Sequence, residues 1–345
     1  MLEKLAFFLD IFNKFKSISI IGTAKNVGKT TTLNYMINIA KNKYNLGLTS
    51  IGRDGESKDA IFSTPKPRIY VEKGTIIATA KQCISNTDIT KEILVATDFK
   101  TPLGEILIIR ALSDGFVELA GPSKNSELLE IKNILFSFNC DFVIIDGAVN
   151  RKSYASPIVT DATILATGAA FSPDIDRVVH HTSHLVNLLS LEGEKNSQII
   201  NLSKKIIQNG TIGFISPNHE TKIINNFNAR EALKNVKKEL LNDYQIIVVK
   251  GIVSDNFIEE FMNYVKNYNR MVLLVEDSTK LFLSREVLSR FQKSGGILKV
   301  IYPIKIVGVT INPKSPIGDG FSKDKFLKLL KQNIQISVFN LLEDS

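Results

Sequence analysis

A short apolar run, a glycine-containing loop and an amphipathic helical pattern follow one another near the start of the chain, and this succession constrains the fold most. Residues 18–21 read Ile-Ser-Ile-Ile, which is typical of a buried strand. The loop spans residues 22–31, and the helical pattern begins at about Lys29. The apolar positions at helical spacing are Leu33, Met36, Ile37 and Ala40. Together they predict a strand–loop–helix unit, from which α/β proteins with mostly parallel sheets are built.

Each residue type in this loop suits the binding of a nucleotide's phosphates. Gly28 allows the backbone to approach phosphate oxygens closely, and Lys29 supplies a positive charge for the β- and γ-phosphates. The hydroxyl of Thr30 is placed to coordinate Mg²⁺, and that of Thr31 to contact the α-phosphate. Successive N–H groups from Asn26 onward, with the start of the helix, form a nest for anions. The sequence therefore predicts a Walker A site for ATP and Mg²⁺. The expected nucleotide-binding residues of the loop are Gly22, Thr23, Asn26, Val27, Gly28, Lys29, Thr30 and Thr31.

The spacing of the loop departs from the usual Walker A pattern. Four residues usually separate the two glycines, whereas five separate Gly22 from Gly28, and Thr23 stands where the first glycine would fall. This spacing resembles the loop of dethiobiotin synthetase and its relatives in the ATPase class that includes MinD-type proteins. That class often carries a second lysine five positions before the Walker lysine, where this chain has Ala24. Lys25 is therefore not expected to serve as that intermolecular lysine.

A carboxylate at the end of another apolar strand is the expected partner of the loop. Residues 142–145 form a fully apolar run that ends in Asp146, which is the Walker B arrangement. An aspartate there can hold a water on Mg²⁺ opposite Thr30. A helix cap or a turn is the alternative role for Asp146.

The segment after the next strand, residues 48–51, offers two more acidic side chains. In doubly wound folds this edge of the sheet faces the ligand, so Asp54 or Glu56 could order Mg²⁺ or the attacking water. A plain Asp-Gly turn is the alternative. The expected catalytic residues are Lys29, Asp54 and Asp146, and the expected metal site consists of Thr30, Asp146 and Asp54.

The residue that reads the base is expected near the end of the chain. The Asn/Thr-Lys-x-Asp motif of GTP-specific proteins is absent, because Ser322-Lys323-Asp324 lacks the right first residue and spacing. The strand expected at residues 305–311 runs into Asn312-Pro313, and ATPases related to the class named above often read adenine with an asparagine near a proline after a late strand. Asn312 is therefore expected to contact adenine. A rigid proline-flanked loop is the alternative.

Short β-branched runs and amphipathic helical patterns alternate along most of the chain. They predict an α/β fold of the P-loop NTPase kind, with a doubly wound, mostly parallel sheet. Residues 68–121 leave little room for helices, so a β-rich, antiparallel or mixed insertion is expected there. A second α/β series begins near residue 210 and includes a helix expected over 220–241. The expected regions are 1–195, which binds nucleotide, and 196–345, either a separate lobe or a continuation of the same domain.

Charge and composition narrow the setting of the protein. The net charge is +8, from 43 Lys and Arg against 35 Asp and Glu. The excess is spread along the chain, so a solvated basic surface is favoured over a nucleic-acid site. The two cysteines cannot form a disulfide scaffold, which favours the reducing cytoplasm. No run of 18 apolar residues occurs, so no membrane association is expected.

Two smaller features carry expectations of their own. The apolar residues Leu2, Leu5, Leu9 and Phe12 predict a short amphipathic helix that packs on the body. The cluster of His180, His181 and His184 falls on a helix expected over 174–191. The pair His180 and His184 could share a metal, but no carboxylate or cysteine completes a site by its spacing, so a solvated or partner-facing surface is favoured.

Four further segments accompany the phosphate loop. They are Ile51-Gly52-Arg53-Asp54-Gly55-Glu56, Val117-Glu118-Leu119-Ala120-Gly121-Pro122-Ser123, Ile145-Asp146-Gly147-Ala148-Val149-Asn150-Arg151 and Asn312-Pro313-Lys314-Ser315-Pro316. Taken together, the chain resembles the B-type family of reactivases, which accompanies the adenosylcobalamin enzyme lysine 5,6-aminomutase of lysine fermentation. The resemblance covers nearly the full length of the chain.

The resemblance implies an ATP-dependent accessory protein that helps to exchange inactivated cobalamin on the aminomutase. It also implies a second ATPase, of the MutS-like kind, as a partner. Two other classes stay open: a ligase like dethiobiotin synthetase that phosphorylates a small carboxylate, and a module that binds nucleotide without hydrolysing it. The ligase would need a substrate pocket beside the γ-phosphate, and the long C-terminal half makes it less economical.

Overall fold

The computed structural model describes residues 2–52, 68–149, 159–226, 228–234, 243–265, 268–316 and 318–342. The chain divides into two compact units, of which unit 1 comprises Met1–Ser183 and Lys305–Ser345 and unit 2 comprises His184–Ile304. This division differs from the expected boundary at residue 195, because the last segment of the chain returns to unit 1 after unit 2 has been completed.

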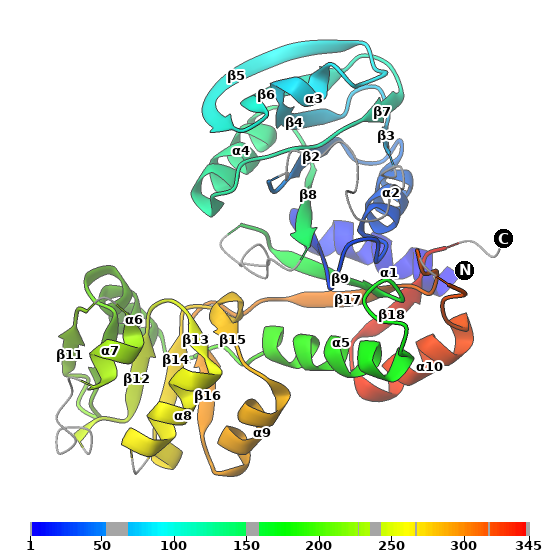
Figure 1. Ribbon diagram of the computed structural model, residues 1–345. Coiled ribbons are helices and arrows are strands. Elements are labelled where there is room, and N and C mark those ends of the chain that lie inside the picture. Colours follow the sequence, from blue (N-terminus) through cyan, green and yellow to red (C-terminus); the bar gives the residue numbers. More distant parts are fainter. Residues whose placement is uncertain are drawn as a thin grey trace. The chain divides into compact units, whose positions relative to one another are not determined.

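A nine-stranded sheet forms the centre of unit 1, with the strand order β18-β17-β9-β1-β8-β2-β4-β6-β5 (Figure 1). Neighbouring strands from β18 to β4 are parallel, while β6 runs antiparallel to both β4 and β5. The strands are β1 (Ser17–Gly22), β2 (Leu46–Ser50), β4 (Ile76–Ala80), β5 (Lys91–Thr101), β6 (Gly104–Ala111), β8 (Phe142–Val149), β9 (Ala162–Gly168), β17 (Ile306–Asn312) and β18 (Ser337–Asn340). The expected mostly parallel sheet with an antiparallel insertion is therefore confirmed.

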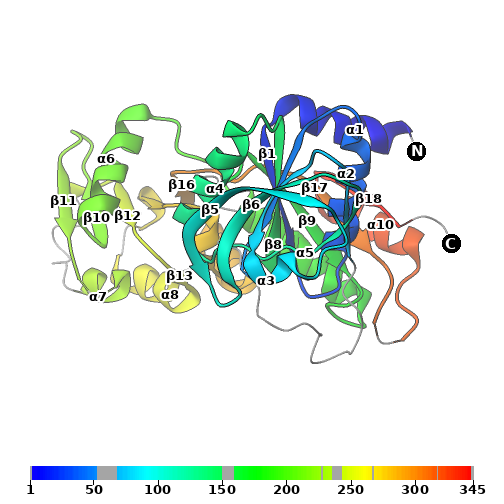
Figure 2. The same cartoon turned by 90° about the horizontal axis from the view of Figure 1, so that it is seen from above.

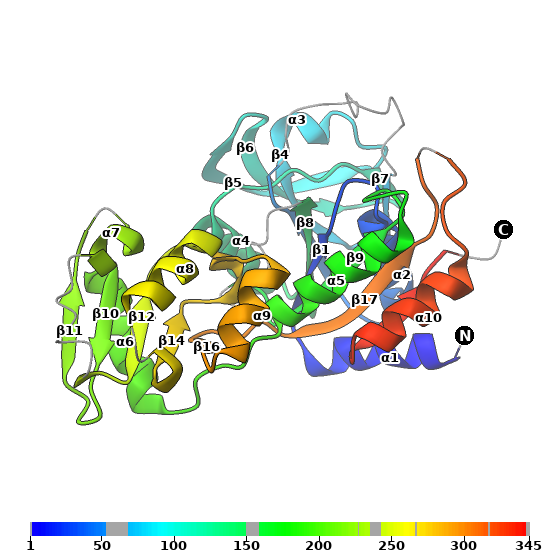
Figure 3. The same ribbon diagram turned by 60° about the horizontal axis from the view of Figure 1, so that its bottom comes forward.

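The insertion forms one end of this sheet and a small ribbon beside it. Figure 2 shows β5 and β6 as a long hairpin, whose strands pair antiparallel. The strands β3 (Ile69–Val71) and β7 (Gly115–Val117) form a separate antiparallel pair. At the other end of the sheet, β17 lies beside β9, as Figure 3 shows, so residues near 310 complete a sheet begun near residue 17.

Helices cover both faces of this sheet. The helices α1 (Leu2–Lys14) and α2 (Lys29–Ala40) share one core with Ile18, Ile20 and Ile144 of the central strands. The helix α4 (Asn125–Ser137) shares another core with Val143 and Ile145, whose side chains point to the opposite face. The remaining helices of unit 1 are α3 (Lys81–Ile84), α10 (Lys323–Asn333) and the first part of α5 (Ile175–Leu189).

The N-terminal helix exists as expected, but its buried face is different. Phe8, Ile11 and Phe12 are its buried residues, whereas Leu2 is 84% exposed and Leu5 37% exposed. The reason is aromatic packing: the Phe8 ring lies 5.0 Å from that of Tyr35 and the Phe12 ring 4.5 Å from that of Phe142. Among the helices of the described residues, none is long and apolar enough to cross a bilayer.

Unit 2 contains a five-stranded sheet with the order β11-β10-β12-β14-β16. The strand β10 runs antiparallel to β11 and β12, and the other neighbouring pairs are parallel. The strands are β10 (Ile212–Ile215), β11 (Thr221–Ile224), β12 (Ile246–Val249), β14 (Val272–Val275) and β16 (Ile297–Val300), with a small pair of β13 (Val253–Ser254) and β15 (Leu281–Phe282). The helices are α6 (Ser197–Asn209), α7 (Ala229–Lys234), α8 (Asp255–Tyr264) and α9 (Arg285–Lys293), and the 3₁₀ turns are η3 (Tyr268–Arg270) and η4 (Ser278–Lys280).

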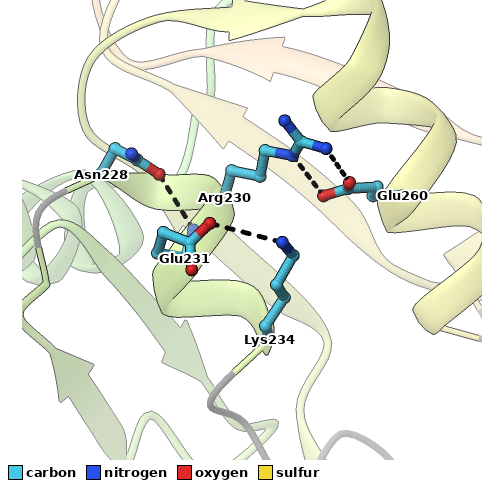
Figure 4. A network of polar contacts seen from close by, with 5 residues as sticks. All are labelled: Asn228, Arg230, Glu231, Lys234 and Glu260. Atoms are coloured by element: carbon cyan, nitrogen blue, oxygen red, sulfur yellow. Dashed lines mark hydrogen bonds and ion pairs between the residues drawn. The ribbon is translucent and has the colours of Figure 1, made fainter.

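One face of the unit 2 sheet packs against α6 and the other against α7, α8 and α9. On the surface of the second face, Arg230 of α7 donates two hydrogen bonds to the Glu260 carboxylate of α8 (Figure 4). The side chain of Asn228 accepts a hydrogen bond from the N–H of Glu231 and so caps the start of α7. The Arg230 guanidinium lowers the pKa of Glu260, because the carboxylate is favoured in its charged form beside a cation.

The helix expected over 220–241 is wrong. Residues 216–220 turn back on themselves, with His219 at φ 64°, and Thr221–Ile224 then pairs with β10 as a hairpin. The helix α7 begins only at Ala229, and residues 235–242 lie outside the described residues. Conversely, α6 occupies the segment expected to be a connection, where the Asn196 side chain caps the helix by accepting from Gln198 and Ile199 N–H groups.

Candidate functional site

The carboxyl ends of β2, β8, β1, β9 and β17 lie at one edge of the unit 1 sheet, because these strands are parallel neighbours. Asp146 of β8 lies in register with Ser50 of β2 and with Ile20 of β1. Gly168 of β9 lies in register with Asn312 of β17. In open α/β sheets ligands bind outside this edge. Four of the segments singled out in the sequence therefore meet at the edge where a ligand is expected.

The phosphate loop leaves the sheet at β1 and turns through two left-handed residues. The N–H of Thr23 still donates to Ala166 O of β9, at 3.0 Å. Asn26 then has φ 60° and Gly28 has φ 95°. Left-handed residues within such a turn direct successive N–H groups to one side, which is the geometry of an anion-binding nest. A side chain at position 28 would be strained, so glycine is the residue that this turn requires.

The helix α2 begins directly after this turn. Gly28 is its N-cap and has no side chain with which to accept hydrogen bonds from the first turn. The N–H groups of a first turn have no acceptor within their own helix, which makes them available to an anion. Thr32 fixes the start of the helix, because its N–H and its hydroxyl both donate to Gly28 O at 3.0 Å. The Thr32 hydroxyl also lies 2.8 Å from that of Thr310 on β17.

The side chain of Lys29 folds back across the end of β1. A Cβ placed on Gly22 would lie 3.0 Å from both Cγ and Cδ of Lys29 and 2.9 Å from Cγ2 of Val27. Val27 is 1% exposed, so it anchors the loop on the sheet. The unusual five-residue spacing is thereby explained: Gly22 is needed at the end of the strand to make room for the lysine stem.

Asn312 lies against the phosphate loop, on the side of β17. Its Nδ2 donates to Asn26 O at 2.9 Å, and its Oδ1 accepts from the N–H of Lys314 at 3.0 Å. The expected reader of adenine thus makes its two hydrogen bonds within the chain, one of them with the loop itself. The structure brings Asn312 to the site, but in contact with the part that would hold phosphate.

A chain of buried hydroxyl groups connects the loop to α5. The Thr182 hydroxyl donates to Val178 O at 2.8 Å, so its neighbour Thr167, at 2.7 Å, must donate to it. The Thr23 hydroxyl in turn donates to Thr167 at 3.3 Å. All three threonines are at most 3% exposed. Sequence reasoning missed Thr167, Thr182, Thr32 and Thr310, because strand pairing joins residues whose spacing along the chain carries no signal.

Asp146 is half-buried beside the strand that leads into the phosphate loop. Its backbone oxygen accepts from Ile51 N–H at 2.9 Å and from the Ser50 hydroxyl at 3.2 Å, which holds β2 and β8 together at this edge. Directly after it, a Cβ on Gly147 would lie 2.7 Å from Ile20 O, so β8 and β1 approach closely here. Thr30, in the first turn of α2, is also half-buried. A threonine hydroxyl that follows β1 and a carboxylate on the neighbouring β8 are oxygen donors that fit Mg²⁺.

The other acidic candidates, Asp54 and Glu56, lie outside the described residues. Within the described part of the chain, no group of three or more His, Cys, Asp and Glu side chains could hold a metal ion. The histidine cluster is dispersed: the His181 ring stacks on Phe171 at 4.2 Å, and His184 Nε2 donates to Leu283 O at 2.7 Å. Because this carbonyl occupies the Nε2 atom of His184, the pair with His180 offers little to a metal.

Both cysteines are buried free thiols. Burial, with Asp141 beside it, raises the pKa of the Cys140 thiol to about 12. The thiol is therefore protonated and unreactive at neutral pH, as expected for a small apolar residue in a core.

No family model matches this chain, and no curated protein is significantly similar to it in sequence. The geometry of the loop and of the sheet edge is what supports a functional proposal.

Proposed function

We propose that this chain is a P-loop NTPase that binds ATP with Mg²⁺ at residues 22–31. The observation that carries the proposal is the combination at this loop of a left-handed Gly28 directly before α2 with a Lys29 stem laid across Gly22. This arrangement presents the first-turn N–H groups and the lysine from one short segment at the ligand edge of a parallel sheet.

Individual residues would share the work of holding the nucleotide. Lys29 would contact the β- and γ-phosphates, and the N–H groups of the loop would bind their oxygens. Thr30 would hold Mg²⁺ directly and Asp146 through a water, since one follows β1 and the other lies on the adjacent β8. The metal would neutralise the phosphate charge when it is bound. ATP is proposed as the preferred nucleotide.

The proposed biological role is that of an ATP-dependent reactivase for an adenosylcobalamin-dependent aminomutase, such as lysine 5,6-aminomutase. Support comes from where the segments that resemble the B-type reactivases lie. Gly52 N–H donates to Pro122 O at 3.1 Å, and Ile51 N–H donates to Asp146 O at 2.9 Å. Three segments that are far apart in the sequence thus touch at one end of the sheet, as parts of one site would.

ATP can drive such a function only if its bound states differ in affinity for open and closed forms of the aminomutase. Nucleotide turnover would then favour an open form, from which inactivated cobalamin leaves and intact adenosylcobalamin enters. A second, MutS-like ATPase is the proposed partner. The five-stranded unit 2 offers surface for such docking beyond the needs of a nucleotide site.

The test starts with an aminomutase that has been inactivated by turnover. ATP, Mg²⁺, fresh adenosylcobalamin, this protein and its candidate partner are added, and recovery of activity is followed while phosphate release is measured in parallel. We expect little hydrolysis by this protein alone and recovery only in the complete mixture. Equal recovery without this protein would refute the role. A phosphorylated small molecule would instead identify a ligase, and binding without any phosphate release would identify a non-hydrolysing module.

A further inference from the structure

Asn312 occupies a space that two glycines keep open. A Cβ on Gly28 would lie 3.2 Å from Cβ of Asn312, and a Cβ on Gly168 would lie 2.4 Å from Asn312 O. The same carbonyl oxygen accepts from Ala169 N–H at 3.0 Å. The residue is thus wedged between the turn of the phosphate loop and the end of β9, where both neighbours lack a side chain.

The two hydrogen bonds of the Asn312 side chain fix the orientation of its amide. Its oxygen accepts from Lys314 N–H and its nitrogen donates to Asn26 O. The reversed orientation would set the amide oxygen against the Asn26 carbonyl and the NH₂ group against the Lys314 N–H, losing both bonds. The NH₂ group therefore faces the phosphate loop.

The bond to Asn26 controls a group that would bind phosphate. Asn26 is left-handed, with φ 60°, a conformation that costs free energy for a residue with a side chain. In a planar trans peptide the carbonyl of Asn26 and the N–H of Val27 point in opposite directions. By holding this carbonyl, Asn312 turns the Val27 N–H away from itself and fixes one donor of the nest.

We propose that Asn312 is a positioning residue for the triphosphate, which holds the loop in its phosphate-binding conformation, and that it does not read adenine. The inference rests on the proposed nucleotide site. It assigns the role to a contact between β17 and the loop, and it departs from the base-reading role expected for this asparagine.

Inorganic triphosphate separates the two roles because it has phosphates and no base. Its affinity, with those of ATP and GTP, is measured by calorimetry for the wild type, Asn312→Ala, Asn312→Asp and the neighbouring control Lys314→Ala. We expect Asn312→Ala to weaken all three ligands equally, by about tenfold, so that the ratio of ATP to GTP affinity is unchanged. The control should bind like the wild type, since only its main-chain N–H contacts Asn312.

The Asn312→Asp variant preserves the shape of the side chain but has no donor for Asn26 O and adds a negative charge. It should bind all three ligands more weakly than Asn312→Ala, and hydrogen exchange at the Val27 amide should be faster in both variants without ligand. Weaker ATP binding with unchanged triphosphate binding would show a base reader and overturn the inference, as would unchanged binding of all ligands. Wild-type protein that binds no triphosphate would instead refute the proposed nucleotide site itself.

Discussion

The aliphatic stem of Lys29 packs on the Cα of Gly22, so the lysine of the phosphate loop and the last residue of the preceding strand share one volume. A Cβ on Gly22 would come within 3.0 Å of two carbons of that stem. Gly22→Ala should therefore displace the lysine and weaken binding of Mg²⁺-ATP, and we expect a stability loss of about 1–3 kcal/mol from overpacking. In a Lys29→Ala background the same change should cost less stability. Chemical denaturation of the two single variants and the double variant measures this difference, and equal costs in both backgrounds would contradict the packing.

Removing the Lys29 charge should abolish most hydrolysis, because the positive charge would be lost from the β- and γ-phosphates. We expect Lys29→Ala to lower partner-stimulated turnover on the order of 100-fold while its circular dichroism stays unchanged. Lys25→Ala is the matched control, since it removes the same charge from an exposed position four residues earlier in the same loop. Similar losses in both variants would show that only the general charge of the loop matters.

Asp146→Asn should act through the metal. The proposed water-mediated contact predicts that half-maximal turnover needs about tenfold more Mg²⁺, while affinity for ATP measured at saturating Mg²⁺ changes little. A Mg²⁺ titration of phosphate release, run beside wild-type protein, gives both values. An unchanged Mg²⁺ requirement would remove Asp146 from the metal site.

The buried hydroxyl chain should transmit nucleotide binding to α5. Thr167→Val preserves the shape of the side chain but breaks the connection between Thr23 and Thr182. We expect nucleotide to slow hydrogen exchange in α5 of the wild type and to slow it much less in this variant. Thr163→Val is the control, because its hydroxyl on the same strand pairs with Ser19 and not with the loop. Equal protection of α5 in both variants would leave the chain without a signalling role.

The stability of the fold should fall at alkaline pH because of Cys140. Its pKa rises from 9.0 to about 12 on folding, as burial disfavours the thiolate. The neutral thiol is thus stabilised in the folded state, fully below pH 9, and this contribution is lost as the pH rises toward 12, by up to about 1.4 kcal/mol per pH unit. Urea unfolding between about pH 8 and pH 11 should show a shallower decline for Cys140→Ala than for the wild type. Parallel curves would contradict the raised pKa.

Sequence patterns predicted the elements whose packing is local. Apolar runs such as Phe142–Ile145 and helical spacing such as Leu33, Met36 and Ile37 place side chains in a core whatever the neighbours are, and all of these residues are buried. The hairpin of β11 was missed because Thr221–Ile224 is too short to show a clear alternation. Its identity as a strand depends on pairing with β10, which no local pattern encodes.

The candidate site shows the same division. The loop could be predicted from its motif, because glycine, lysine and threonine at this spacing after a strand have a chemical purpose of their own. The contacts that hold the loop could not, because Thr310 and Asn312 reach it only through the pairing of β17 with β9. A residue type can be recognised in a sequence, whereas its partner depends on the topology.

The insertion of unit 2 between β9 and β17 has a consequence for biosynthesis. A ribosome completes His184–Ile304 before it adds the strand that carries Thr310 and Asn312. Until then β9 is an edge strand and the phosphate loop lacks its contacts with β17, although the loop itself was made long before. Folding of unit 1 must therefore wait until β17 has emerged, while unit 2, as one continuous stretch, has all its strands as soon as it emerges. A nascent chain stopped at Ile304 would contain every residue of the loop and still be unable to hold it in shape.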